Sequence, residues 1–351
     1  LLFLGGIGTG KTTAINHMIR GVRSIMSQKD VMVIFDAKGD YLKNFYREGD
    51  IVISNDASAT HSWNVFEEIK IDERIEENIL EITKYLFSEK LKKSSQPFFP
   101  NAAKDVLGAL FLHLIRFEEG KKYQNNQSLR EIVDRISTAD FKRILKSHED
   151  LGALISYIDN ETSGQTLGVL SELQQAMREV FVGNFKKKGD FSIRKAIKQK
   201  QGKVIFIEYD LGIGKTLAPI YGLIIDLAIK EALCRREDEG NVYFVLDEFR
   251  LLTPLEHFDN GVNFGRSLGA KFIAGIQNVE QIYDSYGVSP AKSILSGFST
   301  EVSFRLSDES SIEFTKKRAG ESIKRYSYEY QVATKGLFEE LRNGSAIEDW
   351  D

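Results

Sequence analysis

The stretch GGIGTGKTT, from Gly5 to Thr13, decides the fold. It matches the pattern G-x-x-x-x-G-K-[ST] at every fixed position. An apolar run, Leu1–Leu4, precedes it, and Thr13–Arg20 follows with residues that suit a helix. Glycines let such a loop curl so that its backbone N–H groups point inward at phosphate oxygens, and the N-terminus of the following helix adds its dipole. The stretch therefore predicts a phosphate-binding loop, or P-loop.

Two side chains of this loop have specific expected roles. Lys11 would reach the β- and γ-phosphates, and the Thr12 hydroxyl would ligate Mg²⁺. ATP and Mg²⁺ are therefore the expected cofactors. The residues expected to bind the nucleotide are Gly6, Ile7, Gly8, Thr9, Gly10, Lys11, Thr12 and Thr13. A plain glycine turn is the alternative, and the strand and helix patterns on either side argue against it.

A second stretch, GIGKT at Gly212–Thr216, resembles the first but lacks one glycine. The position that corresponds to the first glycine of a P-loop is occupied by Tyr209. A tyrosine cannot take the backbone conformation that this turn reserves for glycine. Because an apolar strand pattern precedes the stretch and an apolar helix pattern follows it, we interpret it as a strand-to-helix connection without a phosphate.

The composition describes an ordinary globular protein. The chain has 351 residues, of which 42% are hydrophobic and 28% charged, so a large core and two domains are expected. Its one cysteine, Cys234, excludes an internal disulfide framework and suits a reducing cytosol. The formal net charge of −4 gives no overall attraction to nucleic acid, so any DNA contact must come from local patches. No apolar run approaches the roughly 18 residues that a membrane span needs.

Strand patterns occur at both ends of the chain. Three of them are almost wholly apolar, as in strands that are buried on both faces of a parallel sheet. Helical patterns separate several of these strands, which predicts a doubly wound α/β sheet. The expected strands are Leu1–Leu4, Val31–Phe35, Ile51–Ser54, Lys203–Glu208, Val242–Leu246, Lys271–Gly275 and Glu301–Arg305.

The middle of the chain has a different pattern. Between about His61 and Asp190 no strand pattern occurs, and apolar residues recur at helical spacing, as at Ile75, Ile79 and Ile82. We interpret this region as an all-α domain inserted into the α/β domain. The expected divisions are residues 1–61 for the first part of the nucleotide-binding domain, 62–190 for the insertion and 191–351 for the second part.

An acidic pair, Asp247 and Glu248, ends the apolar strand pattern that begins at Val242. Open parallel sheets present ligand-binding groups at the carboxyl ends of their strands. Asp247 would hold the water shell of Mg²⁺, and Glu248 would polarise the attacking water. The alternative is that the two acids merely begin a solvated loop.

Two further polar residues flank the next expected strand, Lys271–Gly275. Gln277, at its far end, could sense the γ-phosphate or orient water, because an amide both donates and accepts hydrogen bonds. The alternative is that it caps a turn at the end of the strand. Arg266 precedes the same strand, where an arginine finger and a solvated helix residue are equally compatible with the sequence.

These motifs together resemble the cytoplasmic part of the type IV coupling proteins, the TraD/TrwB-like ATPases of bacterial conjugation. The resemblance covers nearly all 351 residues. One departure is Ala37, which stands where the family pattern D-P-K-G-[DE] has proline. The stretches that carry the resemblance are Gly5–Thr12, Phe35–Asp40, Ser62–Asn64, Phe98–Ala103, Phe191–Arg194, Leu246–Glu248 and Gln277–Gly287, the last similar to Q-x-x-x-Q-[LI]-x-x-x-Y-G.

The resemblance implies a RecA-like P-loop domain, a ring-shaped homohexamer and ATP-driven pumping of DNA. It implies roles for Gln277 as γ-phosphate sensor and for Arg266 as a finger that reaches a neighbour's nucleotide. It also implies a relaxase and type IV secretion channel proteins as partners, at the cytoplasmic face of the bacterial inner membrane. The resemblance further implies an N-terminal transmembrane segment, which we expect before Leu1, where the chain opens in mid-strand without an initiating Met.

Three functions remain compatible with the sequence: a conjugative DNA pump, an FtsK/HerA-like DNA translocase, and an ATP-gated adaptor that recruits secretion substrates. The stretch Gln277–Gly287 favours the first over the second. Lysine clusters at Lys186–Lys188 and at Lys195, Lys198, Lys200 and Lys203 are candidate DNA contacts, although charge runs are more often solvated faces.

Overall fold

A parallel sheet forms the centre of the larger domain. The structure is a computed structural model that describes residues 1–236, 239–320, 324–333 and 341–350. The order of its seven strands is β3-β4-β2-β5-β6-β1-β7, and every pairing among them is parallel. All seven expected strands are present, with ends that differ by at most two residues. The strands are β1 (Leu2–Leu4), β2 (Val31–Asp36), β3 (Ile51–Ile53), β4 (Val204–Glu208), β5 (Val242–Asp247), β6 (Ala270–Ile276) and β7 (Glu301–Ser303).

Each face of this sheet packs against its own apolar core. Alternate side chains of a strand point to opposite faces, so in β2 Met32 and Ile34 belong to one core and Val33 and Phe35 to the other. The predicted doubly wound architecture is confirmed. The helices of this domain are α1 (Lys11–Ile25), α2 (Asp40–Phe45), α9 (Ile193–Gln199), α10 (Gly214–Leu233), α11 (Phe258–Phe264), α12 (Glu280–Tyr286), α13 (Val288–Gly297) and α14 (Glu309–Ala319).

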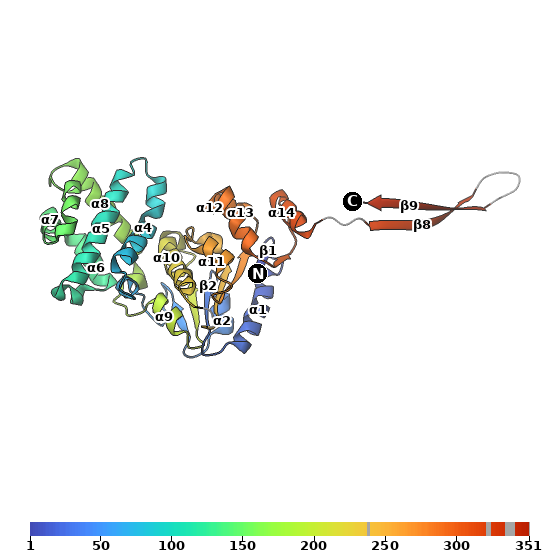
Figure 1. The fold of residues 1–351 in the computed structure, drawn as a ribbon, viewed down its shortest axis with the longest axis horizontal. Coiled ribbons are helices and arrows are strands. Elements are labelled where there is room, and N and C mark those ends of the chain that lie inside the picture. The colour runs from blue at the N-terminus through green and yellow to red at the C-terminus, as the bar shows by residue number, and fades with distance from the viewer. Residues whose placement is uncertain (237–238, 321–323, 334–340, 351) are drawn as a thin grey trace.

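A separate helical domain lies between β3 and β4 in the sequence and occupies the left of Figure 1. No described residue of this segment is in a strand of the sheet. Trp63 and Phe191 form an isolated parallel bridge where the chain leaves and re-enters the sheet domain, which supports 62–190 as the proposed bounds. The helices are α3 (Val65–Ile69), α4 (Ile75–Lys93), α5 (Phe98–Arg116), α6 (Asn126–Arg135), α7 (Thr138–Lys146) and α8 (Gly164–Val180), with 3₁₀ turns η1 (Glu118–Tyr123), η2 (Glu149–Tyr157) and η3 (Gly183–Lys186).

Helix α5 is the apolar centre of the helical domain. Among the described residues it alone has the length and composition that a membrane span requires, with a mean hydropathy of 1.2, so it is an exception to the expectation that no such run occurs. Half of its apolar window is buried inside the protein, and it packs against α4 and α8. We therefore interpret α5 as a core helix of this domain.

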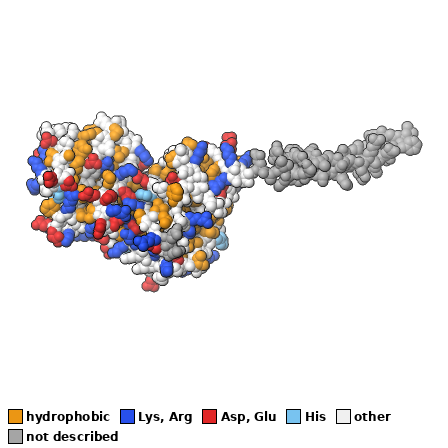
Figure 2. Space-filling view, in the orientation of Figure 1, with side chains coloured by type: hydrophobic (Ala, Val, Ile, Leu, Met, Phe, Trp, Pro, Cys, Tyr) orange, Lys and Arg blue, Asp and Glu red, His pale blue; other side chains and the backbone are white. Residues whose placement is uncertain are grey.

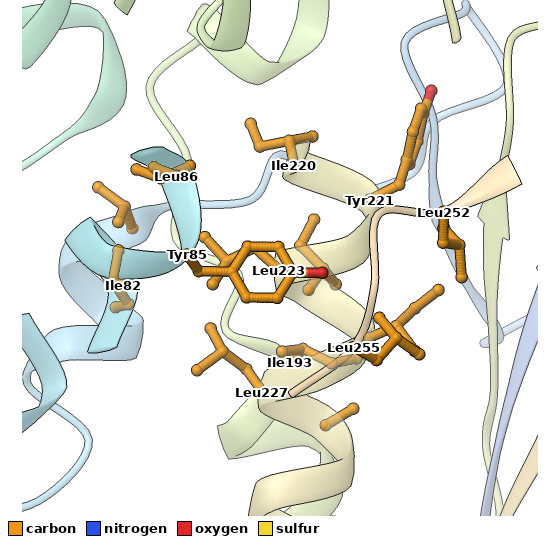
Figure 3. Close-up of a cluster of buried hydrophobic side chains, with 14 of the residues drawn as sticks. Ile82, Tyr85, Leu86, Ile193, Ile220, Tyr221, Leu223, Leu227, Leu252 and Leu255 are labelled. Carbon is orange, nitrogen blue, oxygen red and sulfur yellow. The ribbon is translucent and has the colours of Figure 1, made fainter. Parts of the chain in front are cut away.

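The two domains meet along α4 and α10. Figure 3 shows side chains of these two helices in one buried cluster, with Tyr85 of α4 directed toward the loop that carries Leu252 and Leu255. The Tyr85 hydroxyl pairs with Thr253 Oγ1 at 2.8 Å. The labelled residues from α4 and α10 are Ile82, Tyr85, Leu86, Ile220, Tyr221, Leu223 and Leu227.

A buried arginine ties the same junction together by hydrogen bonds. Arg194 of α9, 1% exposed, donates to Glu231 of α10 at 2.9 Å and to Asn78 of α4 at 2.9 Å. It also donates to Asp72, just before α4, at 3.0 Å. A buried charge is stable only when it is paired and hydrogen-bonded, so these contacts hold α4 against the sheet domain.

One feature of the backbone was not predicted. Beyond α14, the strands β8 (Lys324–Ala333) and β9 (Leu341–Trp350) pair antiparallel, from Lys324 opposite Trp350 to Ala333 opposite Leu341. The hairpin projects to the right of the sheet domain in Figure 1. The expected strands ended at Arg305, although Tyr326, Tyr328, Tyr330 and Val332 alternate with polar residues, a period-two pattern that predicts a strand.

Candidate nucleotide site

The predicted P-loop connects β1 to α1 in the structure. Gly8 and Gly10 have φ angles of 73° and 101°, in the left-handed region that favours glycine. A Cβ on Gly5 would lie 2.6 Å from Cβ of Phe304, so this position has no room for a side chain. The loop is therefore shaped by its glycines, as the sequence predicts.

Lys11 points into this loop. Its side chain is almost fully buried, and its ammonium group donates to the carbonyl oxygens of Gly5 and, at 3.0 Å, Gly6. Burial lowers the pKa of Lys11, while the charges of Glu248 and Asp247 act in the opposite direction. The arrangement places a desolvated cation at the base of the loop, where an anionic group would compensate it.

A cavity of about 640 Å³ opens over the P-loop. This volume lies within the usual range for small-molecule sites. Its walls bring together all eight residues that were expected to bind nucleotide, Gly6 to Thr13, with Glu248 and Gln277. Residues that were not predicted also line it: Ala37, Lys38, Leu211, Arg250 and Leu251.

Asp247 lies at the end of β5, beside Thr12. Its Oδ2 accepts a hydrogen bond from the Thr12 hydroxyl at 3.3 Å and a second from the Tyr41 hydroxyl at 2.7 Å. Its Oδ1 is buried and has no hydrogen-bond partner in the part of the chain that the structure describes. Burial raises the pKa of Asp247, although the Tyr41 and Thr12 hydrogen bonds and the Lys11 charge counteract this effect.

These residues fit a divalent cation with its water shell. A small cavity of about 10 Å³ lies between Thr12, Tyr41, Asp247 and Glu248, which is about the space of one water molecule. A hydroxyl and carboxylate oxygens are the ligands that Mg²⁺ prefers. Oδ2 of Asp247 faces Thr12 and Tyr41, while Oδ1, which has no partner among the described residues, lies over Gly275 of the adjacent strand.

Glu248 and Gln277 contact one another at the ends of adjacent strands. The Gln277 amide nitrogen donates to both carboxylate oxygens of Glu248, at 2.8 and 3.0 Å. Glu248 has a φ of 57°, a conformation that costs energy for a residue other than glycine. Arg250 holds the same carboxylate from its other side at 3.3 Å. The predicted base and the predicted sensor thus form one unit.

Arg266 lies away from this site. It is exposed and precedes β6, whereas Gln277 follows β6, so the two residues lie beyond opposite ends of this strand. A strand of seven residues, such as β6, is roughly 20 Å long. The structure therefore does not bring Arg266 to the nucleotide cavity of its own chain.

The GIGKT stretch forms the connection between β4 and α10, as we interpreted it. A Cβ on Gly214 would lie 2.2 Å from the Tyr209 ring, so the tyrosine occupies the space beside this turn. Lys215 and Thr216 line a different cavity of about 1090 Å³, which also borders Lys90 and Glu179 of the helical domain.

Tyr41 is the contact of Asp247 that sequence reasoning missed. It belongs to α2, which begins at Asp40, the last residue of the stretch Phe35–Asp40 that resembles the family pattern. The signal was available, because β2 and β5 are adjacent parallel strands whose carboxyl ends meet at one edge. Polar residues that follow both strands should therefore have been considered together.

A P-loop after one strand of a parallel sheet, with acidic and amide groups at the ends of the neighbouring strands, defines a RecA-like nucleotide-binding protein. Within this class, the sequence profile of the family described as "Type IV secretion-system coupling protein DNA-binding domain" matches residues 1–337. The chain belongs to this family.

Individual relatives are more distant. The chain is 22% identical to the coupling protein TraD of Escherichia coli (strain K12) over 339 residues, which cover 92% of the chain and 45% of TraD. It thus spans less than half of that relative. Two solved structures share the fold: the bacterial conjugative coupling protein TrwBdeltaN70 in an unbound form (21% identity, TM-score 0.70, 99% of this chain and 76% of that one), and TrwB in complex with ADP and Mg²⁺ (22% identity, TM-score 0.66, 86% and 69%).

Proposed function

We propose that the chain hydrolyses ATP at the P-loop and uses the energy to move DNA in bacterial conjugation, as a coupling protein between the DNA–relaxase substrate and a type IV secretion channel. The observation that carries this proposal is the meeting of Lys11, Glu248 and Gln277 around one cavity, in a chain of the coupling protein family. Asp247 lies beside this cavity, where it accepts a hydrogen bond from Thr12. TrwB, which shares the fold, has been solved with ADP and Mg²⁺.

Binding follows from the loop and from the buried lysine. The backbone N–H groups from Gly6 to Thr13 and the N-terminus of α1 would hold the phosphates. Lys11 would exchange its bonds to the Gly5 and Gly6 carbonyls for the β- and γ-phosphate oxygens. Thr12 and Asp247 would hold Mg²⁺, which, when bound, neutralises charge on the β- and γ-phosphates.

Hydrolysis requires a group that orients and polarises water. Glu248 would accept the proton of the attacking water. Gln277 holds this carboxylate by two hydrogen bonds, so it would sense the γ-phosphate and position the base at the same time. When the nucleotide binds, it would replace water in a site where the acceptor, Glu248, and the donor, Gln277, are already positioned.

Arg266 would act between subunits. Because it stands at the sheet edge opposite to its own P-loop, a catalytic role requires a neighbour's nucleotide. This requirement supports the proposed homohexamer, in which Arg266 would stabilise charge on the adjacent γ-phosphate. Phe264 lies two residues before Arg266, and its side chain is 67% exposed, so a large apolar group is available for such an interface.

DNA would be held by local basic patches. Lys186–Lys188 are exposed at the junction between the two domains. Lys198 is an ion-pair partner of Glu231 at 3.6 Å, so it is less available. On the face shown in Figure 2, Lys and Arg are interspersed with Asp and Glu, which agrees with contacts from selected patches. We place the chain at the cytoplasmic face of the bacterial inner membrane.

The second candidate is an ATP-gated adaptor that turns ATP over slowly. Glu248 argues only against a purely non-hydrolytic switch, because a switch without hydrolysis has no use for a positioned base. The experiment is to measure ATP hydrolysis with and without DNA at several salt concentrations. The proposal predicts stimulation by DNA and binding that weakens steeply with salt, because phosphate contacts release counterions. A rate of ATP hydrolysis that DNA does not change, together with no DNA binding at low salt, would favour the adaptor.

A further inference from the structure

Tyr41 is the most deeply buried polar contact of the Asp247 carboxylate. Its side chain is 2% exposed, and its hydroxyl donates to Asp247 Oδ2 at 2.7 Å. This distance is shorter than the 3.3 Å from the Thr12 hydroxyl to the same oxygen. Hydrogen bonds to an ionised group are stronger than those between neutral groups. The Tyr41 contact is therefore the closer constraint on this carboxylate.

The turn that presents Tyr41 is built for this position. The buried Asp36, at the end of β2, accepts hydrogen bonds from the backbone N–H groups of Lys38 at 3.3 Å and Leu42 at 2.8 Å. Gly39, in a left-handed conformation with φ of 74°, starts α2. These contacts fix the first turn of α2 at the end of β2, and from there the Tyr41 hydroxyl reaches Asp247 at the end of the adjacent strand β5.

We propose that Tyr41 is a positioning residue for the metal site: it holds Oδ2 of Asp247 so that Oδ1 stays free for the water shell of Mg²⁺. This inference rests on the proposed function, since it needs a nucleotide-bound cation. The Thr12 hydroxyl oxygen is the expected metal ligand. Tyr41 is not expected to touch the cation itself.

The environment keeps Tyr41 a donor. Burial, followed by the charge of Asp247, raises the pKa of the Tyr41 phenol, so it keeps its proton at every working pH. Burial raises the pKa of Asp247, and the same hydrogen bond opposes this effect because it stabilises the ionised carboxylate.

The test is a magnesium titration of ADP binding with the Tyr41→Phe variant, which keeps the ring and removes only the hydroxyl. ADP affinity without divalent cation is expected to stay within about twofold of the parent, because the P-loop is intact. Mg²⁺ should increase ADP affinity, and the Mg²⁺ concentration at the midpoint of this increase is expected to rise about tenfold in the variant. Loss of a group that hydrogen-bonds to a metal ligand typically has an effect of this size.

Two controls make the result specific. Tyr46→Phe removes a hydroxyl from a half-exposed tyrosine that follows the same helix, and it should leave the titration unchanged. In an Asp247→Asn background, Tyr41→Phe should add nothing further, since its effect acts through that carboxylate.

An unchanged Mg²⁺ midpoint in Tyr41→Phe would overturn the proposal, and so would an equal loss of ADP affinity with and without Mg²⁺, which would show that Tyr41 only supports the loop. Failure of the parent protein to bind ADP in the presence of Mg²⁺ would instead contradict the proposed function. Circular dichroism on each variant separates both outcomes from unfolding.

Discussion

The amide nitrogen of Gln277 donates hydrogen bonds to both carboxylate oxygens of Glu248, at 2.8 and 3.0 Å. The two residues follow adjacent strands, β5 and β6, at the edge that carries the P-loop. The bonds hold Glu248 in its left-handed conformation. A group that is restrained in a costly conformation beside a cavity is well suited to change its contacts when a ligand arrives.

Glu248→Gln should bind ATP normally and hydrolyse it at least about 100-fold more slowly, because the amide keeps the shape but cannot take a proton. Single-turnover hydrolysis and a separate measurement of ATP affinity distinguish the two steps. Gln277→Ala should also slow hydrolysis while leaving ATP affinity near that of the parent. If Glu248→Gln hydrolyses at the parental rate, the catalytic base lies elsewhere.

Gly275→Ala should weaken the magnesium dependence of nucleotide binding. A Cβ at this position would lie 2.4 Å from Oδ1 of Asp247 and 3.3 Å from Cδ1 of Ile15, so the carboxylate must move. Gly21→Ala is the matched control, because nothing lies within 4 Å of a Cβ there and alanine should stabilise the interior of α1. A Gly275→Ala protein with a normal response to Mg²⁺ would show that Oδ1 does not serve the cation.

Arg266→Ala should leave each subunit folded and able to bind ATP, while hydrolysis falls by about 10³-fold, the low end for an arginine finger. Mixing supplies the direct test. Arg266→Ala subunits keep the P-loop and Lys11→Ala subunits keep the finger, so mixed rings should regain partial activity. Mixtures that stay inactive while rings demonstrably form would exclude a role between subunits.

The free energy of unfolding should depend on pH through Asp72. Burial raises the pKa of Asp72, but the Asn78 hydrogen bond and the Arg194 charge outweigh it, and the pKa falls to about 2. Because the folded state lowers this pKa, its contribution is complete above the unfolded value near 4 and is lost as pH falls through about 2.

The corresponding variant is Asp72→Asn. It should lower the free energy of unfolding at pH 7 by on the order of 2 kcal/mol, and the difference from the parent should shrink at pH 3. Urea denaturation at both pH values measures this. Asp284→Asn, at an exposed position, is the control. A difference that is the same at both pH values would show that Asp72 does not act through its charge.

Much of the nucleotide site could be predicted because its parts are local in sequence. The P-loop is a continuous pattern, and the acids and Gln277 end strands whose apolar pattern is clear. Tyr41 could not be placed in this way, since its role depends on the pairing of β2 with β5. Arg266 precedes β6 and Gln277 follows it, so their separation could be predicted, but the role of Arg266 depends on a second subunit. The β8–β9 hairpin was missed although Tyr326, Tyr328, Tyr330 and Val332 alternate with polar residues in β8; only β9 lacks such a pattern.

The most direct test of the central claim compares ATP hydrolysis by the parent protein, Lys11→Ala and Lys215→Ala, all with DNA present. Lys11 is buried in the P-loop, whereas Lys215 occupies the similar stretch that faces another cavity. We predict that Lys11→Ala abolishes hydrolysis and weakens ATP binding, because the phosphates lose the only point charge of the loop. Lys215→Ala should keep an ATP affinity within about twofold of the parent. Unchanged turnover in Lys11→Ala, or an equal loss in Lys215→Ala, would contradict the account.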